Sequence, residues 1–175
     1  MLNAIMMRPM SFEEIKQYIE FSQREYAQGM LMQGEYPDYE AALVAAKNEV
    51  NYYYNRKKEG EAHYAYYLVN AQTGTKVGLL AFSILQRHKS SASFIFVDYI
   101  SIFPEFRRRG YARYAMIWLE GWAREHGFDT IDLNVMMHKK GAIALYQGLG
   151  YQIFAERALG LSKEPGRYDM RKQLH

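Results

Sequence analysis

The chain has 175 residues, enough to bury one substantial core but too few for two ordinary domains without a visible linker. Hydrophobic residues make up 49% and charged residues 23%, the usual mixture of a globular protein, and the net charge of +3 is too small to predict nucleic-acid binding by itself. Cysteine is absent, which excludes disulfides, thiolate metal sites and a cysteine nucleophile.

The N-terminal segment, residues 1–8, lacks a basic stretch followed by a long apolar run, so it does not read as a signal peptide. No window of the sequence reaches the apolar length that crosses a membrane. No spacing of side chains is typical of a metal site either. We therefore expect a cytoplasmic protein without a membrane, metal or nucleic-acid partner.

The first third of the chain predicts one strand and two helices. Residues 4–7 form a short apolar run typical of a strand. Ser11 and Glu14 have the spacing of a capping box, in which each side chain bonds the main-chain N–H of the other residue. Apolar residues then recur at helical spacing until about Gly29, and Asp38 is placed to cap a second helix that ends near Arg56.

After the second helix the apolar period becomes strand-like, and two further helices interrupt a series of strands. The expected strands are 62–70, 76–85, 94–103, 130–137, 151–158 and 167–172, and the helices are 109–126 and 138–148. Crossovers through these two helices are expected to form parallel strand pairs. The order predicts a single α/β (α+β) domain over residues 1–175, with a mixed central sheet of about seven strands and about four helices.

The most distinctive stretch joins the strand that begins at Phe94 to the helix after it. Pro104 stops the strand, and three consecutive arginines, residues 107–109, stand directly before Gly110, where the helix is about to begin. Glycine lets the backbone approach a ligand closely, and a helix start presents unpaired N–H groups with a partial positive charge. This order suits an anion such as a pyrophosphate; a solvated basic turn without a ligand is the alternative.

Two motifs in the second half resemble the GNAT superfamily of acyl-CoA-dependent N-acyltransferases. Arg107-Arg108-Arg109-Gly110-Tyr111-Ala112 is similar to the family's phosphate-binding sequence, and Ala142 to Tyr146 followed by Leu149-Gly150-Tyr151 is similar to a second family feature. The resemblance covers about residues 77–174. It implies a GNAT-like fold with splayed central parallel strands, acetyl-CoA as co-substrate and, in some members, a homodimer.

The resemblance also implies which residues contact acetyl-CoA. The strand would bind the pantetheine arm through its main chain, the basic turn would bind the pyrophosphate, and the Ile100 N–H would stabilise the thioester oxygen. Lys139 stands where the family often has asparagine, which changes one contact, although a lysine can reach a phosphate. The expected cofactor-binding residues are Ile100, Ser101, Ile102, Arg107, Arg108, Arg109, Gly110, Tyr111, Ala112, Asn134, Lys139 and Tyr146.

Tyr146 matches the family tyrosine that protonates the departing thiolate. A phenol with a pKa near 10 suits that role in a site from which water is excluded. The alternative is an ordinary core aromatic on an amphipathic helix.

The general base is less well marked by the sequence. Many family members carry a glutamate four residues before the oxyanion-binding position, where this chain has Phe96. Asp98 is the nearest acid, and strand alternation predicts that it shares a face with Phe96 and Ile100. Asp98 is therefore the candidate base, and an ion pair with an arginine is the structural alternative. Weaker candidates are Glu61, His63 and Glu156.

The expected function is transfer of the acetyl group of acetyl-CoA directly to a primary amine of a small molecule or peptide, through a ternary complex. The absence of cysteine agrees with direct transfer. A non-catalytic acyl-CoA-binding regulatory domain and a protein N-terminal or lysine acetyltransferase are the alternatives. Acceptor specificity is expected in the first two helices and in segments 33–38 and 158–167, which contain Glu35, Tyr36, Asp38 and Tyr39.

Overall fold

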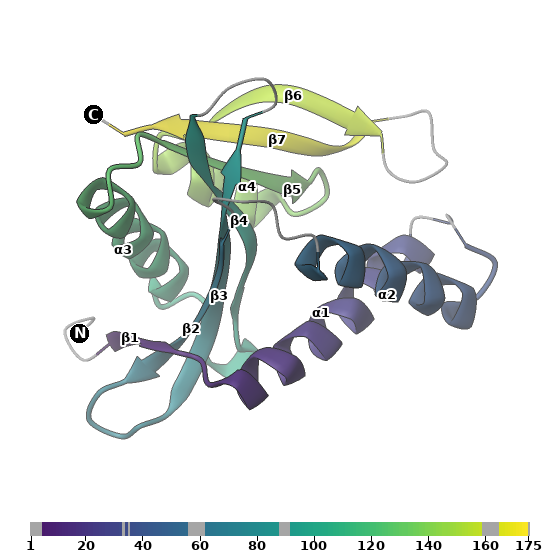
Figure 1. Ribbon diagram of the computed structural model, residues 1–175, viewed down its shortest axis with the longest axis horizontal. Helices are drawn as coiled ribbons and strands as arrows, with labels where there is room; N and C mark the ends of the chain where they lie inside the picture. Colours follow the sequence, from purple (N-terminus) through teal and green to yellow (C-terminus); the bar gives the residue numbers. More distant parts are fainter. Residues whose placement is uncertain are drawn as a thin grey trace.

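The sheet at the centre of the molecule has seven strands in the order β1-β2-β3-β4-β5-β7-β6 (Figure 1). The computed structural model describes residues 5–32, 34, 36–55, 62–87, 92–158 and 165–174, with the backbone alone at 52–55. The strands are β1 (Ile5–Pro9), β2 (Ala62–Asn70), β3 (Lys76–Gln86), β4 (Ser93–Ile102), β5 (Thr130–Met136), β6 (Gln152–Ala158) and β7 (Pro165–Gln173). The helices are α1 (Phe12–Met32), α2 (Tyr39–Asn55), α3 (Tyr111–Glu125) and α4 (Lys140–Gly148).

The element order and the mixed sheet confirm the predicted architecture. Three helix boundaries differ by a few residues. α1 continues through Gly29 to Met32, α3 begins at Tyr111, and α4 begins at Lys140. Gly29 does not end its helix because its φ is not positive and the chain stays helical there.

The strand pairing differs from the prediction at one crossover. β1 to β4 form an antiparallel series, and β4 pairs in parallel with β5. The crossover through α4 was expected to give a second parallel pair, which is wrong: β7 lies between β5 and β6 and is antiparallel to both. The last strand therefore fills the edge of β5 that β6 leaves open.

The parallel pair at the centre of the sheet separates after three residues. β4 and β5 are in register only from Ile95 with Ile131 to Val97 with Leu133. Beyond this point β4 remains paired with β3 as far as Ile102, and β5 remains paired with β7 as far as Met136. The central strands therefore splay, as expected, and the sheet opens between them.

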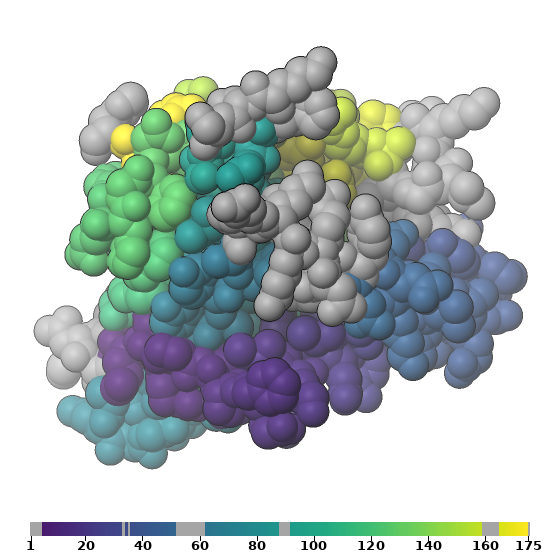
Figure 2. Space-filling model, viewed as in Figure 1, coloured from purple at the N-terminus to yellow at the C-terminus, as the bar shows by residue number. Residues whose placement is uncertain are grey.

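The two faces of the sheet are covered by different helices (Figure 1). On one face α3 and α4 pack against a core that contains Phe82, Ile95 and Met116. On the other face Tyr18 of α1 packs against Leu79 and Ala81 of β3. In the space-filling view α1 and α2 form a continuous surface, purple passing into blue (Figure 2).

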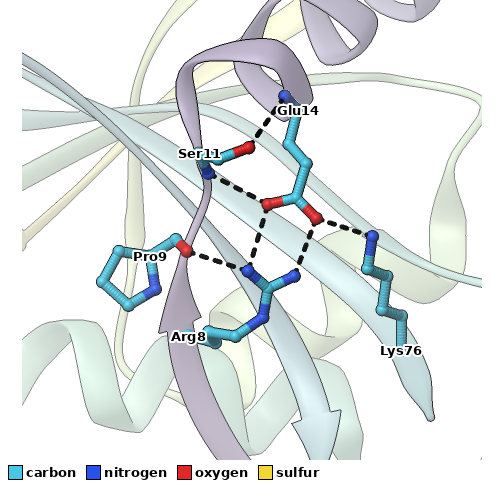
Figure 3. Close-up of polar contacts among 5 residues, drawn as sticks. All are labelled: Arg8, Pro9, Ser11, Glu14 and Lys76. Carbon is cyan, nitrogen blue, oxygen red and sulfur yellow. Dashed lines mark hydrogen bonds and ion pairs between the residues drawn. The ribbon is translucent and has the colours of Figure 1, made fainter. Parts of the chain in front are cut away.

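The capping box at the start of α1 is also a junction between three elements (Figure 3). The main-chain N–H of Glu14 donates to Ser11 Oγ at 3.3 Å, and the N–H of Ser11 donates to Glu14 Oε2 at 2.9 Å. Glu14 also accepts hydrogen bonds from Arg8 of β1 and from Lys76 of β3, the shortest of each being 2.8 Å. These contacts hold the pKa of the Glu14 carboxyl well below its usual range, chiefly through the Arg8 hydrogen bonds.

The second half of α1 and the whole of α2 form a helical hairpin with its own small core. Ala27 and Met30 pack against Ala42 and Ala46. Tyr36 and Tyr39 pack onto this core, and Asp38 caps α2 by accepting the Ala41 N–H at 2.9 Å. These three residues, expected to serve acceptor specificity, thus stabilise the hairpin, and Glu35 lies outside the described residues.

No helix in the described part of the chain is long and apolar enough to cross a membrane.

Candidate active site

A cleft of about 700 Å³ lies where β4 and β5 part. Because the sheet is open there, side chains from both of its faces reach the same space. The cleft is lined by residues of α1 and α2 on one side, of β4 and β5 at its centre, and of the α4 start on the other side. Those used below are Glu25, Tyr26, Glu49, Phe96, Asp98, Tyr99, Ile100, Asn134, His138, Lys139, Tyr146 and Arg167.

A β-bulge in β4 sets the direction of the side chains that face the cleft. Ala81 pairs with Tyr99 and Phe82 pairs with Val97, so Asp98 is an extra residue in β4. Val97 packs in the core under α3, and after the bulge Ile100 returns to that same core. The prediction that Asp98 and Ile100 share a face is therefore wrong, because alternation is interrupted between them.

Asp98 lies on the α1 face of the sheet, beside Tyr99. Tyr99 packs against Tyr18 of α1 with ring centroids 5.9 Å apart. Asp98 Oδ2 accepts a hydrogen bond from the Ser83 hydroxyl at 2.5 Å, and Ser83 Oγ is 2.5 Å from Nδ1 of His63. His63, a weaker candidate base in the sequence, is thus connected to Asp98 through Ser83.

Only one of the two other weaker candidates lies in the described part of the chain. This residue, Glu156, is exposed on β6 and is not among the residues that line the cleft. Glu61 lies outside the described residues.

Tyr146 borders the cleft from α4 and is only 6% exposed. It packs edge-on against Tyr151, with ring centroids 6.0 Å apart, so it also belongs to the core. Burial raises the pKa of Tyr146 to about 12. The phenol is therefore held in its protonated form, which is the form that a general acid requires.

The basic turn after β4 has the backbone of an anion-binding turn. A short 3₁₀ helix at Pro104–Phe106 precedes it, and Gly110, with φ of 83°, caps the start of α3 in the left-handed region. Arg108 is also left-handed, with φ of 62°. Main-chain N–H groups at the start of α3 are unpaired within the helix and carry a partial positive charge.

The arginines of the turn are exposed, and two of them are oriented by neighbours. Arg107 Nε donates to the Ile102 carbonyl at 2.9 Å, which joins the turn to the end of β4. Arg109 lies over the Phe106 ring at 5.8 Å. These contacts position cations beside the helix start.

The expected cofactor-binding residues form one continuous path. Ile100, Asn134, Lys139 and Tyr146 line the cleft. Ser101 and Ile102 continue β4 away from the cleft. Residues 107–112 follow as the basic turn and the first residues of α3. These residues thus follow a splayed strand that leads to the start of a helix. Such an arrangement suits a long ligand with an anionic centre.

Two acids in the cleft were not among the candidates from the sequence. Glu25 of α1 and Glu49 of α2 line it on the side of Asp98. Glu49 accepts a hydrogen bond from Tyr26 at 2.9 Å. The pKa of Tyr99 is raised, mainly by burial and also by the charge of Glu25. Both glutamates occupy exposed positions on amphipathic helices, a pattern that gives no signal of a site.

The sequence profile of the acetyltransferase (GNAT) family matches residues 29–151. The chain belongs to the GNAT acetyltransferase family. It is 28% identical over 148 residues to the uncharacterised N-acetyltransferase YycN of Bacillus subtilis, an alignment that covers 85% of this chain and 92% of YycN. It is 27% identical over 148 residues to YdgE of the same bacterium, with the same coverage of the two chains.

Solved structures agree with this family assignment. The crystal structure of YycN has a TM-score of 0.71 and covers 91% of this chain and 98% of its own. The spermidine N-acetyltransferase of Vibrio cholerae, solved with CoA and spermine, has a TM-score of 0.62 at 14% identity, covering 98% of this chain and 96% of its own. At that identity the likeness is one of fold. The chain is thus a GNAT N-acetyltransferase, an enzyme class that uses acyl-CoA as its donor.

Proposed function

We propose that this enzyme transfers the acetyl group of acetyl-CoA directly to the primary amine of a small cationic molecule, within a ternary complex. The observation that carries the proposal is the cleft between the diverging strands, which Asp98 and Tyr146 both line from opposite faces of the sheet. No cysteine is available for an acyl-enzyme, which supports direct transfer.

The residues present fit acetyl-CoA. β4 has no β5 partner after Val97, so its main chain at Ile100, Ser101 and Ile102 can bond a pantetheine arm as an added strand would. The N–H groups of residues 108–112 would hold the pyrophosphate at the start of α3, and Arg107 and Arg109 would add charge-assisted contacts. Lys139 and Asn134 border the same path from the other side of the cleft.

Bound acetyl-CoA supplies the thioester carbon that the amine attacks. Asp98 accepts a proton from the substrate ammonium, which frees the nitrogen lone pair for attack. The Ile100 N–H donates to the thioester oxygen as that oxygen gains negative charge. Tyr146 donates its proton to the leaving sulfur and recovers one from the nitrogen by way of solvent. The products of the reaction are an amide, CoA as its thiol and one proton, which Asp98 releases.

The distribution of charge in the cleft favours a cationic acceptor. Asp98, Glu25 and Glu49 lie on the side formed by β4, α1 and α2, together with Tyr26 and Tyr99. His138, Lys139 and Arg167 lie on the side of α4 and β7, which is the side expected to face the anionic donor. Carboxylates and aromatic faces are the groups that bind an ammonium.

A matched set of variants tests the acceptor side. Glu25→Gln and Glu49→Gln are expected to raise the KM for 1,4-diaminobutane about fivefold each, because each removes a charge worth about 1 kcal/mol near a cation. The acetyl-CoA dissociation constant should not change. Glu20→Gln, an exposed position on α1 outside the cleft, is the control and should alter neither constant.

A screen tests the function as a whole. The release of CoA thiol is measured with acetyl-CoA and 1,4-diaminobutane, propylamine, an alanine-ended peptide or a lysine peptide. Turnover of the diamine above all others supports the proposal. Preference for either peptide would favour a protein acetyltransferase. Saturable acetyl-CoA binding without turnover of any amine would favour a regulatory acyl-CoA-binding domain.

A further inference from the structure

Three polar side chains form a line across three neighbouring strands behind the cleft. His63 of β2 is the direct partner of Ser83 of β3 in the sheet. The bulge in β4 brings Asp98 within 2.5 Å of Ser83 Oγ, whose other neighbour is His63 Nδ1 at 2.5 Å. Asp98 lines the cleft, whereas Ser83 and His63 lie behind it.

Ser83 is fully buried, with none of its surface exposed. A buried hydroxyl is costly unless it is hydrogen-bonded, and Ser83 has only one proton to donate. An ionised Asp98 can only accept, so the Ser83 proton belongs to the bond with Asp98. Ser83 Oγ must then accept from His63, which assigns a proton to Nδ1 of the imidazole. The direction of both hydrogen bonds follows from the charge on Asp98.

We propose that Ser83 and His63 are positioning residues that hold the Asp98 carboxylate in the orientation needed to take the proton from the acceptor amine. The inference rests on the proposed function, because it requires Asp98 to be the base. It adds two residues that do not touch the substrate and that lie on strands β2 and β3, away from both family motifs.

The bulge explains why Asp98 needs such support. At a bulge the extra residue is left out of the regular pairing, so the sheet alone does not fix the direction of its side chain. The terminal torsion of an aspartate is broad, and a carboxylate there can rotate. A base displaced by about 1 Å from its proton can cost on the order of 100-fold in rate. A buried serine oriented by a histidine removes this freedom.

The first test needs no acceptor. Crystal structures of the wild type and of Ser83→Ala, both with CoA, are compared at Asp98. Alanine fills nearly the same volume, so the sheet should be unchanged while the Asp98 carboxylate rotates or is seen in more than one orientation. An Asp98 side chain in its wild-type place in Ser83→Ala would overturn the proposal.

The second test is kinetic and uses acetyl-CoA with 1,4-diaminobutane. Ser83→Ala and His63→Leu are expected to lower kcat about 10- to 100-fold, with little change in the KM of the diamine, the acetyl-CoA dissociation constant or Tm. His63→Asn should recover most of the loss seen in His63→Leu, because its amide nitrogen can stand near the position of Nδ1 and donate to Ser83. Equal losses in the asparagine and leucine variants would count against the hydrogen bond.

A double-variant comparison separates positioning from a merely structural role. If Ser83 acts through Asp98, Ser83→Ala should lower kcat no further in an Asp98→Asn background. An additive loss would overturn the proposal. Full activity of Asp98→Asn would instead overturn the base assignment in the proposed function. An inactive Asp98→Asn together with a fully active Ser83→Ala would overturn this inference alone. If the wild type does not acetylate the diamine, the acceptor class fails, and the structural comparison still decides the positioning.

Discussion

Tyr146 combines two properties that usually exclude each other, since it is packed in the core and also borders the cleft. Burial disfavours the phenolate and raises the pKa of Tyr146 to about 12. A group with that pKa keeps its proton across the neutral and mildly alkaline range. At physiological pH it is therefore in the protonated form that the proposed general acid requires.

Replacement of Tyr146 by phenylalanine removes the hydroxyl of the proposed acid while preserving the packing of the ring. We expect Tyr146→Phe to lower kcat about 100-fold or more, because general acids typically contribute that much. The acetyl-CoA dissociation constant should stay the same. In the wild type, this group should cause no loss of kcat up to about pH 10, because its pKa is raised and not lowered. Steady-state kinetics from pH 6 to 10 measure both effects, and an unchanged turnover number in Tyr146→Phe would refute the acid assignment.

At the scale of elements, the turn between β4 and α3 depends on backbone conformation. Gly110 has φ of 83°, which a β-branched residue adopts only with strain. Gly110→Val should therefore displace the N–H groups at the start of α3 and raise the acetyl-CoA dissociation constant at least tenfold. Gly121→Ala is the control, because Gly121 lies within α3 with no atom near the position of a Cβ. Calorimetric titration with acetyl-CoA compares the two variants with the wild type. If Gly110→Val binds acetyl-CoA as tightly as Gly121→Ala does, the turn does not bind the donor.

The spacing of β3 and β4 also matters for the donor. A Cβ on Gly78 would lie 2.5 Å from the Ser101 carbonyl oxygen and 2.8 Å from Cδ1 of Ile102. Gly78→Ala must therefore push the end of β4 outwards, where the pantetheine arm is expected to bond. We expect a loss of about 1 to 3 kcal/mol in the free energy of unfolding and weaker acetyl-CoA binding. Urea denaturation and titration measure the two effects, and a variant with wild-type values in both would show that β4 moves freely here.

Elements and their order could be predicted because their signals are local. The capping box is formed by Ser11 and Glu14, which are three residues apart in the sequence. The spacing of apolar residues that distinguishes a helix from a strand is likewise read within a single segment. The bulge at Asp98 could not be predicted, because it arises from pairing with β3 and no glycine or proline marks it. The insertion of β7 between β5 and β6 likewise depends on partners distant in sequence.

In the candidate site, too, the residues in local motifs could be predicted and those brought together by strand pairing could not. The basic turn and Tyr146 could be named as candidates from the sequence because they belong to motifs with fixed spacing. Glu25 and Glu49 reach the cleft only because the α1–α2 hairpin is placed over the opened sheet. His63 and Ser83 join Asp98 only through the register of three strands. Side chains brought together by tertiary pairing leave no local signal.

Across the whole molecule, Glu14 ties together the first strand, the first helix and the third strand (Figure 3). Its side chain is 18% exposed, and its carboxylate accepts hydrogen bonds from Arg8 and Lys76. The pKa of Glu14 is lowered in the folded protein, first by Arg8 and then by Lys76. A depressed folded-state pKa means that the ionised form stabilises the fold above the unfolded-state value of about 4.3. That stability is lost as the pH falls from there through the folded-state value.

Glu14→Gln should therefore lower the free energy of unfolding at pH 7 by about 1 to 2 kcal/mol, a range discounted for partial exposure of the pairs. The difference from the wild type should shrink as the pH falls below about 4, because the glutamate of the unfolded chain is then protonated and must lose that proton before it can pair with Arg8 and Lys76 in the folded protein. Glu13→Gln is the matched control: Glu13 is 73% exposed, and its only described ion pair is with Lys16 at 3.7 Å. It should have little effect at either pH. Urea denaturation at pH 7 and pH 3 measures the free energy of unfolding of both variants. If Glu14→Gln lowers that free energy as much at pH 3 as at pH 7, the packing of the side chain, and not its charge, joins the three elements.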